Sequence, residues 1–166
     1  MSESTLKGAI AEAAITAEAV KLGVVVLRPF PEGRRYDLVY DVDHNLDRVQ
    51  CKWGKRKDGV IVVYTGTCRL TPDGYVRTTY SSHEIDGIAV YCADTDQCYF
   101  VPIKEVEGRS VVHLRLTPTA NRQVIAIKYA SEYTLQGAIA QLGERRHGMA
   151  EVVGSSPTSS TLARPS

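Results

Sequence analysis

The sequence lacks the long apolar segments and leader features of membrane and secreted proteins. Its longest apolar runs, such as Val24–Leu27 and Ile61–Val63, fall far short of the roughly 20 residues that a membrane span needs. The N-terminal residues have neither the basic nor the apolar region of a signal peptide. A glycine-rich phosphate-binding loop is also missing. We therefore expect a cytoplasmic protein with no membrane partner and no nucleotide cofactor.

An excess of one charge is missing as well, since 20 Lys and Arg residues balance 19 Asp and Glu residues. No global field attracts a polyanion, so any binding of nucleic acid has to depend on a local patch. The four cysteines include no C-x-x-C pair, and the four histidines have no cysteine or carboxylate at ligand spacing. We therefore expect neither a zinc site nor disulfides, and we interpret the cysteines as mostly buried apolar residues.

What is present is the composition of one globular domain, with 166 residues of which 43% are hydrophobic and 23% charged. From about Thr5 to Leu22, apolar residues recur at spacings of three and four. This spacing predicts an amphipathic helix, with Ser4 as its N-cap and Gly23 just beyond its end. A second, short helix is predicted over Arg122–Tyr133.

Short segments rich in β-branched residues predict strands, and turn sequences such as Lys57-Asp58-Gly59 and Pro72-Asp73-Gly74 separate them. The segment Ile85–Cys92 is apolar enough to be buried on both faces, as a central strand of an α/β sheet is. We therefore predict an α/β fold. The other predicted strands are Val24–Arg28, Tyr36–Val42, Leu46–Trp53, Val60–Thr65, Gln97–Ile103 and Val111–Leu116, with two more on either side of Pro72-Asp73-Gly74.

The composition changes after Thr134. Residues 135–166 contain Ser and Thr clusters with two prolines, and this stretch resembles a bacterial tRNA gene translated as protein. We therefore expect a folded domain over residues 1–134 and a disordered tail over residues 135–166. Leu135, Ile139 and Leu142 are the evidence against this boundary, because their helical spacing could continue the last helix onto the domain.

Four polar residues are candidates for one site. In a strand, Gln50 and Lys52 point to the same face, and Asp37 in the preceding strand can lie across from them. Glu12 is on the helix that has to pack against the same sheet. Oxygen ligands for Mg²⁺, a metal-bound water and a nearby cation are what phosphodiester hydrolysis needs. The backbone carbonyl of Cys51 is a further ligand candidate, because strand geometry aims it into the site.

Three motifs carry a resemblance to a known family: KGxxxE from Lys7 to Glu12, RYDLV from Arg35 to Val39, and VQCK from Val49 to Lys52. They resemble motifs of the PD-(D/E)xK nuclease superfamily, and within it the group I intron-encoded homing endonucleases of the cyanobacterial kind. The resemblance covers roughly residues 6 to 133. It implies a restriction-endonuclease-like core, in which an N-terminal helix precedes a mixed β-sheet with flanking helices.

The resemblance also implies roles for the site residues. Glu12 and Asp37 would be metal ligands, Gln50 a ligand or water-positioning group, and Lys52 the catalytic cation, with Mg²⁺ as cofactor and Mn²⁺ as a possible substitute. Tyr36 replaces the proline of the motif, and Gln50 replaces its acidic residue. The intron-encoded branch resembles this sequence in using Gln at that position, so we expect catalysis to be retained.

Cations near the predicted site are candidates for DNA phosphate contacts. Those that follow the catalytic strand form a run with no acidic residue before Asp58, and a ribbon around Pro72-Asp73-Gly74 has the width and donors to read a major groove. For each of them, a solvated surface side chain is the alternative. The candidates are Lys7, Arg34, Arg35, Lys55, Arg56, Lys57, Arg69 and Arg77.

Together these features predict a metal-dependent endonuclease that cuts a long double-stranded DNA target. One active site cuts one strand, so a double-strand break by so small a protein requires at least a dimer, and a dimer or tetramer is expected. Two alternatives stay open. One is a Holliday-junction resolvase, whose helix motif is similar, and the other is a non-catalytic nucleic-acid-binding splicing helper that lost cleavage through Gln50.

Overall fold

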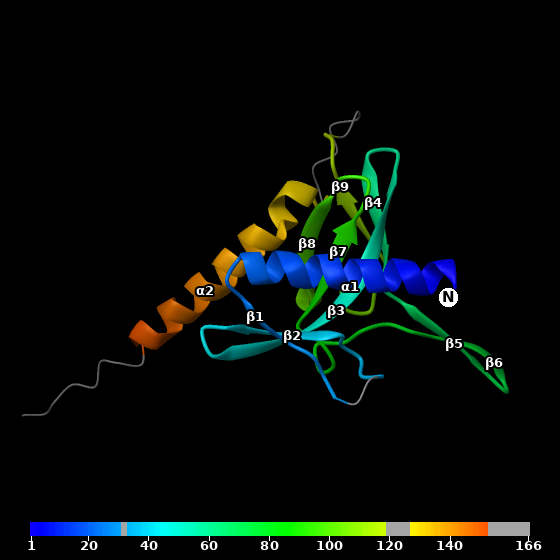
Figure 1. The fold of residues 1–166 in the computed structure, drawn as a ribbon, viewed down its shortest axis with the longest axis horizontal. Coiled ribbons are helices and arrows are strands. Elements are labelled where there is room, and N and C mark those ends of the chain that lie inside the picture. Colours follow the sequence, from blue (N-terminus) through cyan, green and yellow to red (C-terminus); the bar gives the residue numbers. More distant parts are fainter. Residues whose placement is uncertain (31–32, 119–126, 153–166) are drawn as a thin grey trace, which may run out of the picture.

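The structure, a computed structural model, describes residues 1–30, 33–118 and 127–152, without the side chains of residues 68–70 and 145–152. A mixed β-sheet forms its centre (Figure 1). Helix α1 (Glu3–Lys21) and helix α2 (Leu135–Val152) pack against one apolar cluster on this sheet. The predicted α/β class, with an N-terminal helix, a mixed sheet and flanking helices, is confirmed.

Helix α1 forms where the apolar spacing predicts it. Ala11, Ile15 and Ala19, four residues apart, face the sheet and are buried. The helix begins earlier than expected, because Ser2 and not Ser4 is the N-cap: the Ser2 hydroxyl accepts a hydrogen bond from the backbone N–H of Thr5 at 3.2 Å. Gly23 follows the helix with a φ of +84°, the left-handed conformation that glycine adopts most easily.

The main sheet confirms the predicted strands and shows how they pair. In the described ranges its strands follow the order β1-β2-β3-β4-β9, and β7 pairs with β3 and carries β8 on its other side. The β3–β7 pair is parallel, whereas the other pairs are antiparallel. The bounds are β1 (Val25–Leu27), β2 (Leu38–Val42), β3 (Asn45–Lys57), β4 (Val60–Tyr64), β7 (Gly87–Cys92), β8 (Gln97–Pro102) and β9 (Val111–Arg115).

Among the described residues, no strand pairs with the middle of one edge of β3. Strand β2 pairs with β3 only as far as Val49, and β4 begins its pairing at Gly54. The other edge of residues 49–53 is bonded to β7. The interval between Val49 and Gly54 therefore leaves backbone groups of β3 without a neighbouring strand on that side, and these groups need other partners.

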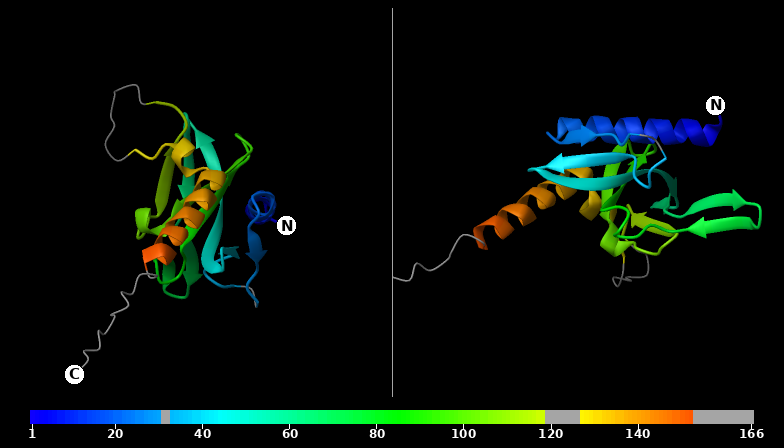
Figure 2. Two further views of the ribbon diagram at one scale, coloured as in Figure 1. Left: turned by 90° about the vertical axis from the view of Figure 1, so that its left-hand side faces the viewer. Right: turned by 90° about the horizontal axis from the view of Figure 1, so that it is seen from below.

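Strands β5 (Thr67–Thr71) and β6 (Gly74–Thr78) form a separate two-stranded ribbon. The turn between them is at the predicted Pro72-Asp73-Gly74 sequence. The ribbon extends away from the body of the molecule (Figures 1 and 2). Tyr75 is 76% exposed, so the ribbon offers its side chains to solvent or to a partner.

The core consists of two apolar clusters, one on each face of β7. Ala89 packs with α1 and α2, while Ile88 and Val90 pack with β4, β9 and the 3₁₀ helix η1 (Ile103–Glu105). This confirms the predicted central strand buried on both faces, although the strand begins at Gly87 and not at Ile85. The thiols of Cys51, Cys92 and Cys98 are free, and Cys68 lies outside the described side chains.

Two predictions about the C-terminal part need correction. Of the helix predicted over residues 122–133, residues 122–126 lie outside the described ranges, and only a 3₁₀ turn, η2 (Ala130–Tyr133), is found. The disordered tail predicted from residue 135 is wrong for residues 135–152, which form α2. Leu135 is 1% exposed, and Ile139 and Leu142 pack against the same cluster. Their apolar contacts outweigh the loop-like composition, and residues 153–166 lie outside the described ranges.

No helix in the described part of the chain is long and apolar enough to cross a membrane.

The burial of Leu135 generates a prediction about where the folded domain ends. We expect Leu135→Ala to lower the free energy of unfolding by about 2–5 kcal/mol, because it leaves a cavity between α2 and the sheet. The neighbouring exposed residue provides the control, Gln136→Ala, which should change stability by less than about 0.5 kcal/mol. Equal denaturation midpoints for the two variants would show that α2 contributes nothing to the fold.

Candidate active site

Asp37 fills the gap beside β3. Its backbone N–H bonds to the carbonyl of Val49 at 2.9 Å, next to the last residue pair of the β2–β3 ladder, Leu38 and Val49. Its carboxylate Oδ2 accepts a hydrogen bond from the backbone N–H of Cys51 at 2.8 Å and another from the side-chain amide of Gln50. The carboxylate therefore replaces the missing strand, and Asp37, Gln50 and Cys51 meet at one point, as the sequence predicts.

The carbonyl of Cys51 points to the same place. In a strand, the N–H and C=O groups of one residue face the same edge, and the N–H of Cys51 faces Asp37. The Gln50 amide nitrogen lies 3.3 Å from this carbonyl oxygen and also donates to Asp37 Oδ2. The Gln50 NH₂ group, which carries partial positive charge, thus lies between the Asp37 carboxylate oxygen and the Cys51 carbonyl oxygen, both of which are predicted metal ligands. This donor set suits a hard divalent cation.

Glu12 approaches from α1. Glu12 and Asp37 line one pocket together with Arg28, which follows β1. The Nη1 of Arg28 is 2.5 Å from Glu12 Oε1, and its charge weakly opposes the rise that burial causes in the pKa of Asp37. The two predicted carboxylate ligands therefore share a cation. Among the described residues, no group of three or more His, Cys, Asp and Glu side chains could hold a metal ion.

Lys52 is half-buried next to this carboxylate. Its Nζ lies 5.3 Å from the ring centroid of Tyr80, and Asp37 is close enough to favour its charged form. Arg35 approaches the same ring, with its guanidinium carbon 4.3 Å from the centroid. A ring face attracts cations at such distances. Tyr80, which is 4% exposed, thus supports two cations beside the carboxylate.

Burial dominates the electrostatics of these groups. It raises the pKa of Asp37, and contacts with Cys51, Lys52, Gln50 and Arg28 only partly offset this effect. Burial lowers the pKa of Lys52, which Asp37 opposes and Arg35 reinforces. The pKa of Tyr80 rises to about 12, again mainly through burial. The charged forms of both Asp37 and Lys52 therefore gain from further opposite charge, which a metal ion and a phosphate would supply.

The cations proposed for DNA binding are not all available. Lys7 pairs with Glu3 at 2.5 Å, and Arg35 uses all three of its nitrogens in internal hydrogen bonds. Arg34 is exposed and lines the Glu12–Asp37 pocket. The remaining cations lie at the end of β3 and on the ribbon: Lys55, Arg56, Lys57 and Arg77 are exposed, and the side chain of Arg69 lies outside the described part of the structure.

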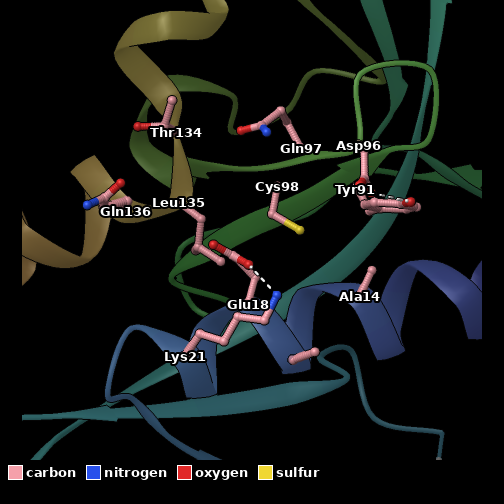
Figure 3. A pocket seen from close by; sticks show the side chains of 11 residues that line it. Ala14, Glu18, Lys21, Tyr91, Asp96, Gln97, Cys98, Thr134, Leu135 and Gln136 are labelled. Atoms are coloured by element: carbon pink, nitrogen blue, oxygen red, sulfur yellow. Dashed lines mark hydrogen bonds and ion pairs between the residues drawn. The ribbon is translucent and has the colours of Figure 1, made fainter.

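A second pocket lies between α1, the β7–β8 turn and the start of α2 (Figure 3). Its wall includes an ion pair between Lys21 and Glu18 at 3.3 Å and the thiol of Cys98. Burial raises the pKa of Cys98 to about 12, which makes a thiolate nucleophile unfavourable here. None of the predicted site residues lines this pocket.

Sequence reasoning missed two residues of the site, Arg28 and Tyr80. Arg28 could have been found, because it ends the first predicted strand and the antiparallel register puts the end of β1 beside the start of β2. Tyr80 gave no such signal. It is more than 25 residues from the other site residues in sequence, and its position depends on how the chain returns from the ribbon.

Comparisons with known proteins agree with this geometry. The PD-(D/E)XK endonuclease family model matches residues 2–136, from α1 to the start of α2. The structure of the bacterial homing endonuclease I-Ssp6803I is similar, with a TM-score of 0.72, 27% sequence identity, and coverage of 90% of this chain and 99% of that chain. No curated protein sequence matches this chain. The family match spans most of the sequence and confirms the resemblance of the three motifs, so the chain belongs to the PD-(D/E)XK endonuclease family.

Proposed function

We propose that this protein is a homing endonuclease that hydrolyses double-stranded DNA with a bound divalent metal ion. The metal is Mg²⁺, and Mn²⁺ can replace it. The observation that carries the proposal is that Asp37, Gln50 and Cys51 meet at the unpaired edge of β3. Lys52 is the next residue of the same strand. The family match and the similarity to a bacterial homing endonuclease support the same activity.

The ligands of the metal would be the carboxylates of Glu12 and Asp37 and the carbonyl oxygen of Cys51. When bound, the metal would lower the pKa of a water molecule and neutralise charge on the scissile phosphate. For Glu12 to bind it, the carboxylate has to exchange its Arg28 partner, and Arg28 is then free to contact a phosphate oxygen. With two carboxylates as the only charged ligands, affinity should be weak until DNA phosphate oxygens join them.

The other side chains orient and stabilise the reacting groups. The Gln50 amide nitrogen holds Asp37 Oδ2 in place, and the Gln50 amide oxygen can turn towards the attacking water. The Lys52 ammonium can stabilise negative charge that develops on the phosphate oxygens in the transition state. Its partial burial strengthens this interaction, because little water screens it.

DNA binding would use the exposed cations around the site. Arg34 lines the pocket, and Lys55, Arg56 and Lys57 extend from β3 beyond the catalytic residues. The backbone N–H of Arg56 bonds to Asp94 Oδ2 at 3.3 Å, which fixes the strand that carries these side chains. Lys7, Arg69 and Arg77 are further candidates for phosphate or base contacts.

We also propose that the protein is encoded within a group I intron and acts in the cytoplasm, where its free thiols would stay reduced. The genomic position of the reading frame tests the first statement. A frame that lies inside such an intron supports homing as the biological role. A frame far from any group I intron would favour another nuclease role for the same active site.

Cleavage of both DNA strands predicts an oligomer. Each chain contributes one candidate site, so a double-strand break needs at least two copies. We expect sedimentation of the DNA-cleaving protein to give a dimer or tetramer, and cleavage of a duplex to yield double-strand ends. A monomer that produces only nicks would contradict this expectation and leave the active site itself unaffected.

The roles of Asp37 and Lys52 generate a prediction about activity. Asp37→Asn keeps an acceptor for the Cys51 N–H but loses the charge, and Lys52→Gln loses the cation. We expect each to reduce cleavage by at least about 100-fold, because both act on the transition state. The exposed Lys104 of η1 provides the control, since Lys104→Gln should cleave at the wild-type rate.

The measurement does not require a known target. Duplexes with a randomised insert are incubated with protein and Mg²⁺ or Mn²⁺, and the new ends are sequenced. Wild-type activity in either catalytic variant, at an unchanged melting temperature, would contradict the assignment. A four-way junction added to the same assay separates the activities, because preferential cutting of the junction would favour a resolvase. Specific binding without cutting by the wild type would favour a splicing helper.

The position of Gln50 generates a prediction about metal affinity. Gln50→Glu puts a second carboxylate against Asp37, so the two negative charges repel until a divalent cation binds between them. We expect the variant to bind Mn²⁺ more tightly than the wild type in calorimetry, without DNA. Its melting temperature should be lower than that of the wild type without metal and should rise more on metal addition. Equal affinities would mean that Gln50 does not face the metal.

A further inference from the structure

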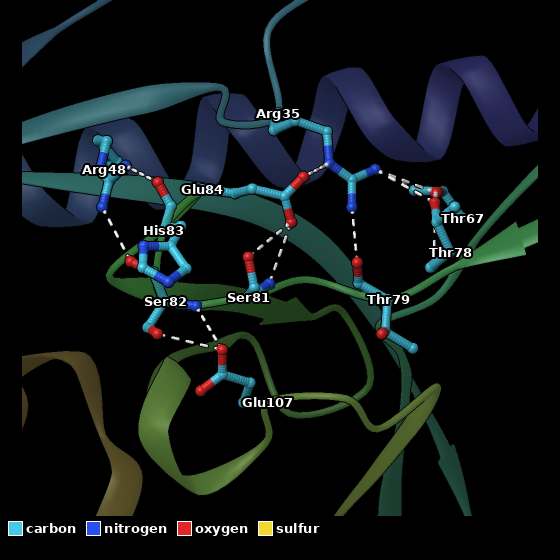
Figure 4. A network of polar contacts seen from close by, with 10 residues as sticks. All are labelled: Arg35, Arg48, Thr67, Thr78, Thr79, Ser81, Ser82, His83, Glu84 and Glu107. Carbon is cyan, nitrogen blue, oxygen red and sulfur yellow. Dashed lines mark hydrogen bonds and ion pairs between the residues drawn. The ribbon is translucent and has the colours of Figure 1, made fainter.

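The two arginines next to the loop that follows the ribbon have different surroundings (Figure 4). Arg48 bonds to Asp86 and to the carbonyls of Ser82 and His83, all of which lie in the loop between β6 and β7. Arg35 also bonds to both strands of the β5–β6 ribbon. The arginine that precedes the active-site aspartate by two residues is therefore also the one that holds the ribbon.

The Arg35 contacts gather at the base of the ribbon. Its Nη1 bonds to the hydroxyls of Thr67 at 3.1 Å and Thr78 at 3.5 Å, and its Nη2 bonds to the carbonyl of Thr79 at 2.8 Å. Thr67 and Thr78 are partners across the two strands, and their hydroxyls are 2.6 Å apart. One planar guanidinium thus bonds to the first residue of β5, the last residue of β6 and the residue after it.

The remaining nitrogen of Arg35 is held from the other side. Its Nε bonds to Glu84 Oε1 at 2.8 Å, and Glu84 Oε2 accepts bonds from the N–H and hydroxyl of Ser81. Beneath the guanidinium is the buried ring of Tyr80, which also contacts Lys52. The side chain of Arg35 is only 34% exposed. These bonds leave Arg35 one N–H donor for a phosphate. Any contribution of Arg35 to DNA binding would therefore come mainly from the ribbon that it holds in place.

We propose that Arg35 is a positioning residue that fixes the β5–β6 ribbon relative to the Asp37–Lys52 site, so that DNA seated on the ribbon is presented to the catalytic groups. An isolated two-stranded ribbon is marginally stable and free to swing, and this one extends from the body. Its exposed Arg77 and Tyr75 are suited to contact a duplex. This inference rests on the proposed function.

The ribbon anchor and the catalytic site are linked because they share a chain segment and a tyrosine ring. Arg35 and Asp37 are on one short segment, whose end is bonded to β3 at Val49. Arg35 and Lys52 contact one tyrosine ring. A rotation of the ribbon about its base would therefore change the distance between bound DNA and the site. A misplacement of about 1 Å at a reacting group can cost about 100-fold in rate.

The test compares Arg35→Gln and Arg35→Lys with a matched control, Arg48→Gln, which breaks a similar set of bonds without touching the ribbon. Amide hydrogen exchange of residues 67–78 measures ribbon anchoring without any DNA. We expect faster exchange in both Arg35 variants and wild-type exchange there in Arg48→Gln. The lysine variant keeps the charge but lacks the planar fork, so it should not restore the anchor. Wild-type ribbon exchange in Arg35→Gln would overturn the proposal.

Cleavage of duplexes with a randomised insert gives the second readout. We expect the Arg35 variants to bind DNA within about threefold of the wild type but to cleave at a rate lowered by up to about 100-fold, with cut positions more widely spread. Thr67→Val, which leaves Arg35 in place but removes its bond to Thr67 and the bond between the Thr67 and Thr78 hydroxyls, should cause a smaller change of the same kind. It replaces Arg35→Gln in this test if that variant does not fold. Equal rates and cut positions in the Arg35 and Arg48 variants would overturn the link to catalysis.

The two hypotheses fail in different ways. If the wild type and Arg48→Gln cleave and Arg35→Gln cleaves equally well, the proposed function is supported and this inference is wrong. If the wild type cleaves no duplex, the proposed function is wrong and the link of Arg35 to cleavage is overturned with it, whatever the exchange data show for the ribbon.

Discussion

The candidate site depends on one unsatisfied edge of a strand. Strand β3 is long enough to pair with β2 at one end and with β4 at the other, and no strand in the described part of the chain covers that side between Val49 and Gly54. A buried backbone N–H without a partner is costly. The Asp37 carboxylate satisfies the N–H of Cys51, so the bond that completes the sheet also holds the carboxylate in place. Function and fold are coupled at this bond.

The charges around that carboxylate are arranged in compensating pairs. Arg28 neutralises Glu12, and Glu84 partly neutralises Arg35 next to Lys52. Such pairing makes a half-buried cluster of ionisable groups tolerable without a ligand. It also means that metal and DNA would bind by exchange of partners. This would account for the weak metal binding that we propose for the free protein, and it makes Arg28 part of the candidate site although it is not a predicted ligand.

The surroundings of the site divide into a packed body and an extended two-stranded ribbon. Both faces of β7 are covered by apolar clusters, which fixes β3 through its parallel pairing with β7. Among the side chains that the structure describes, no apolar cluster covers the β5–β6 ribbon, and we infer that polar bonds at its base determine its direction. Under the proposed function this division is useful, because the candidate catalytic groups would stay fixed while the proposed contact surface reaches outward.

The sequence by itself determined the order of the elements and several candidate residues of the site, but not Arg28 or Tyr80. Helical spacing, turn residues such as Asp58 and Gly59, and the apolar segment Ile85–Cys92 are local signals, and local backbone preferences decide them. The motifs brought Asp37, Gln50 and Lys52 together because adjacent strands of a hairpin have a predictable register. Only the tertiary structure decided the rest. Three features depend on segments far apart in the chain: the break in pairing beside Cys51, the burial of Leu135 where α2 packs on the body, and the internal bonds of Arg35. No local pattern encodes where such segments meet.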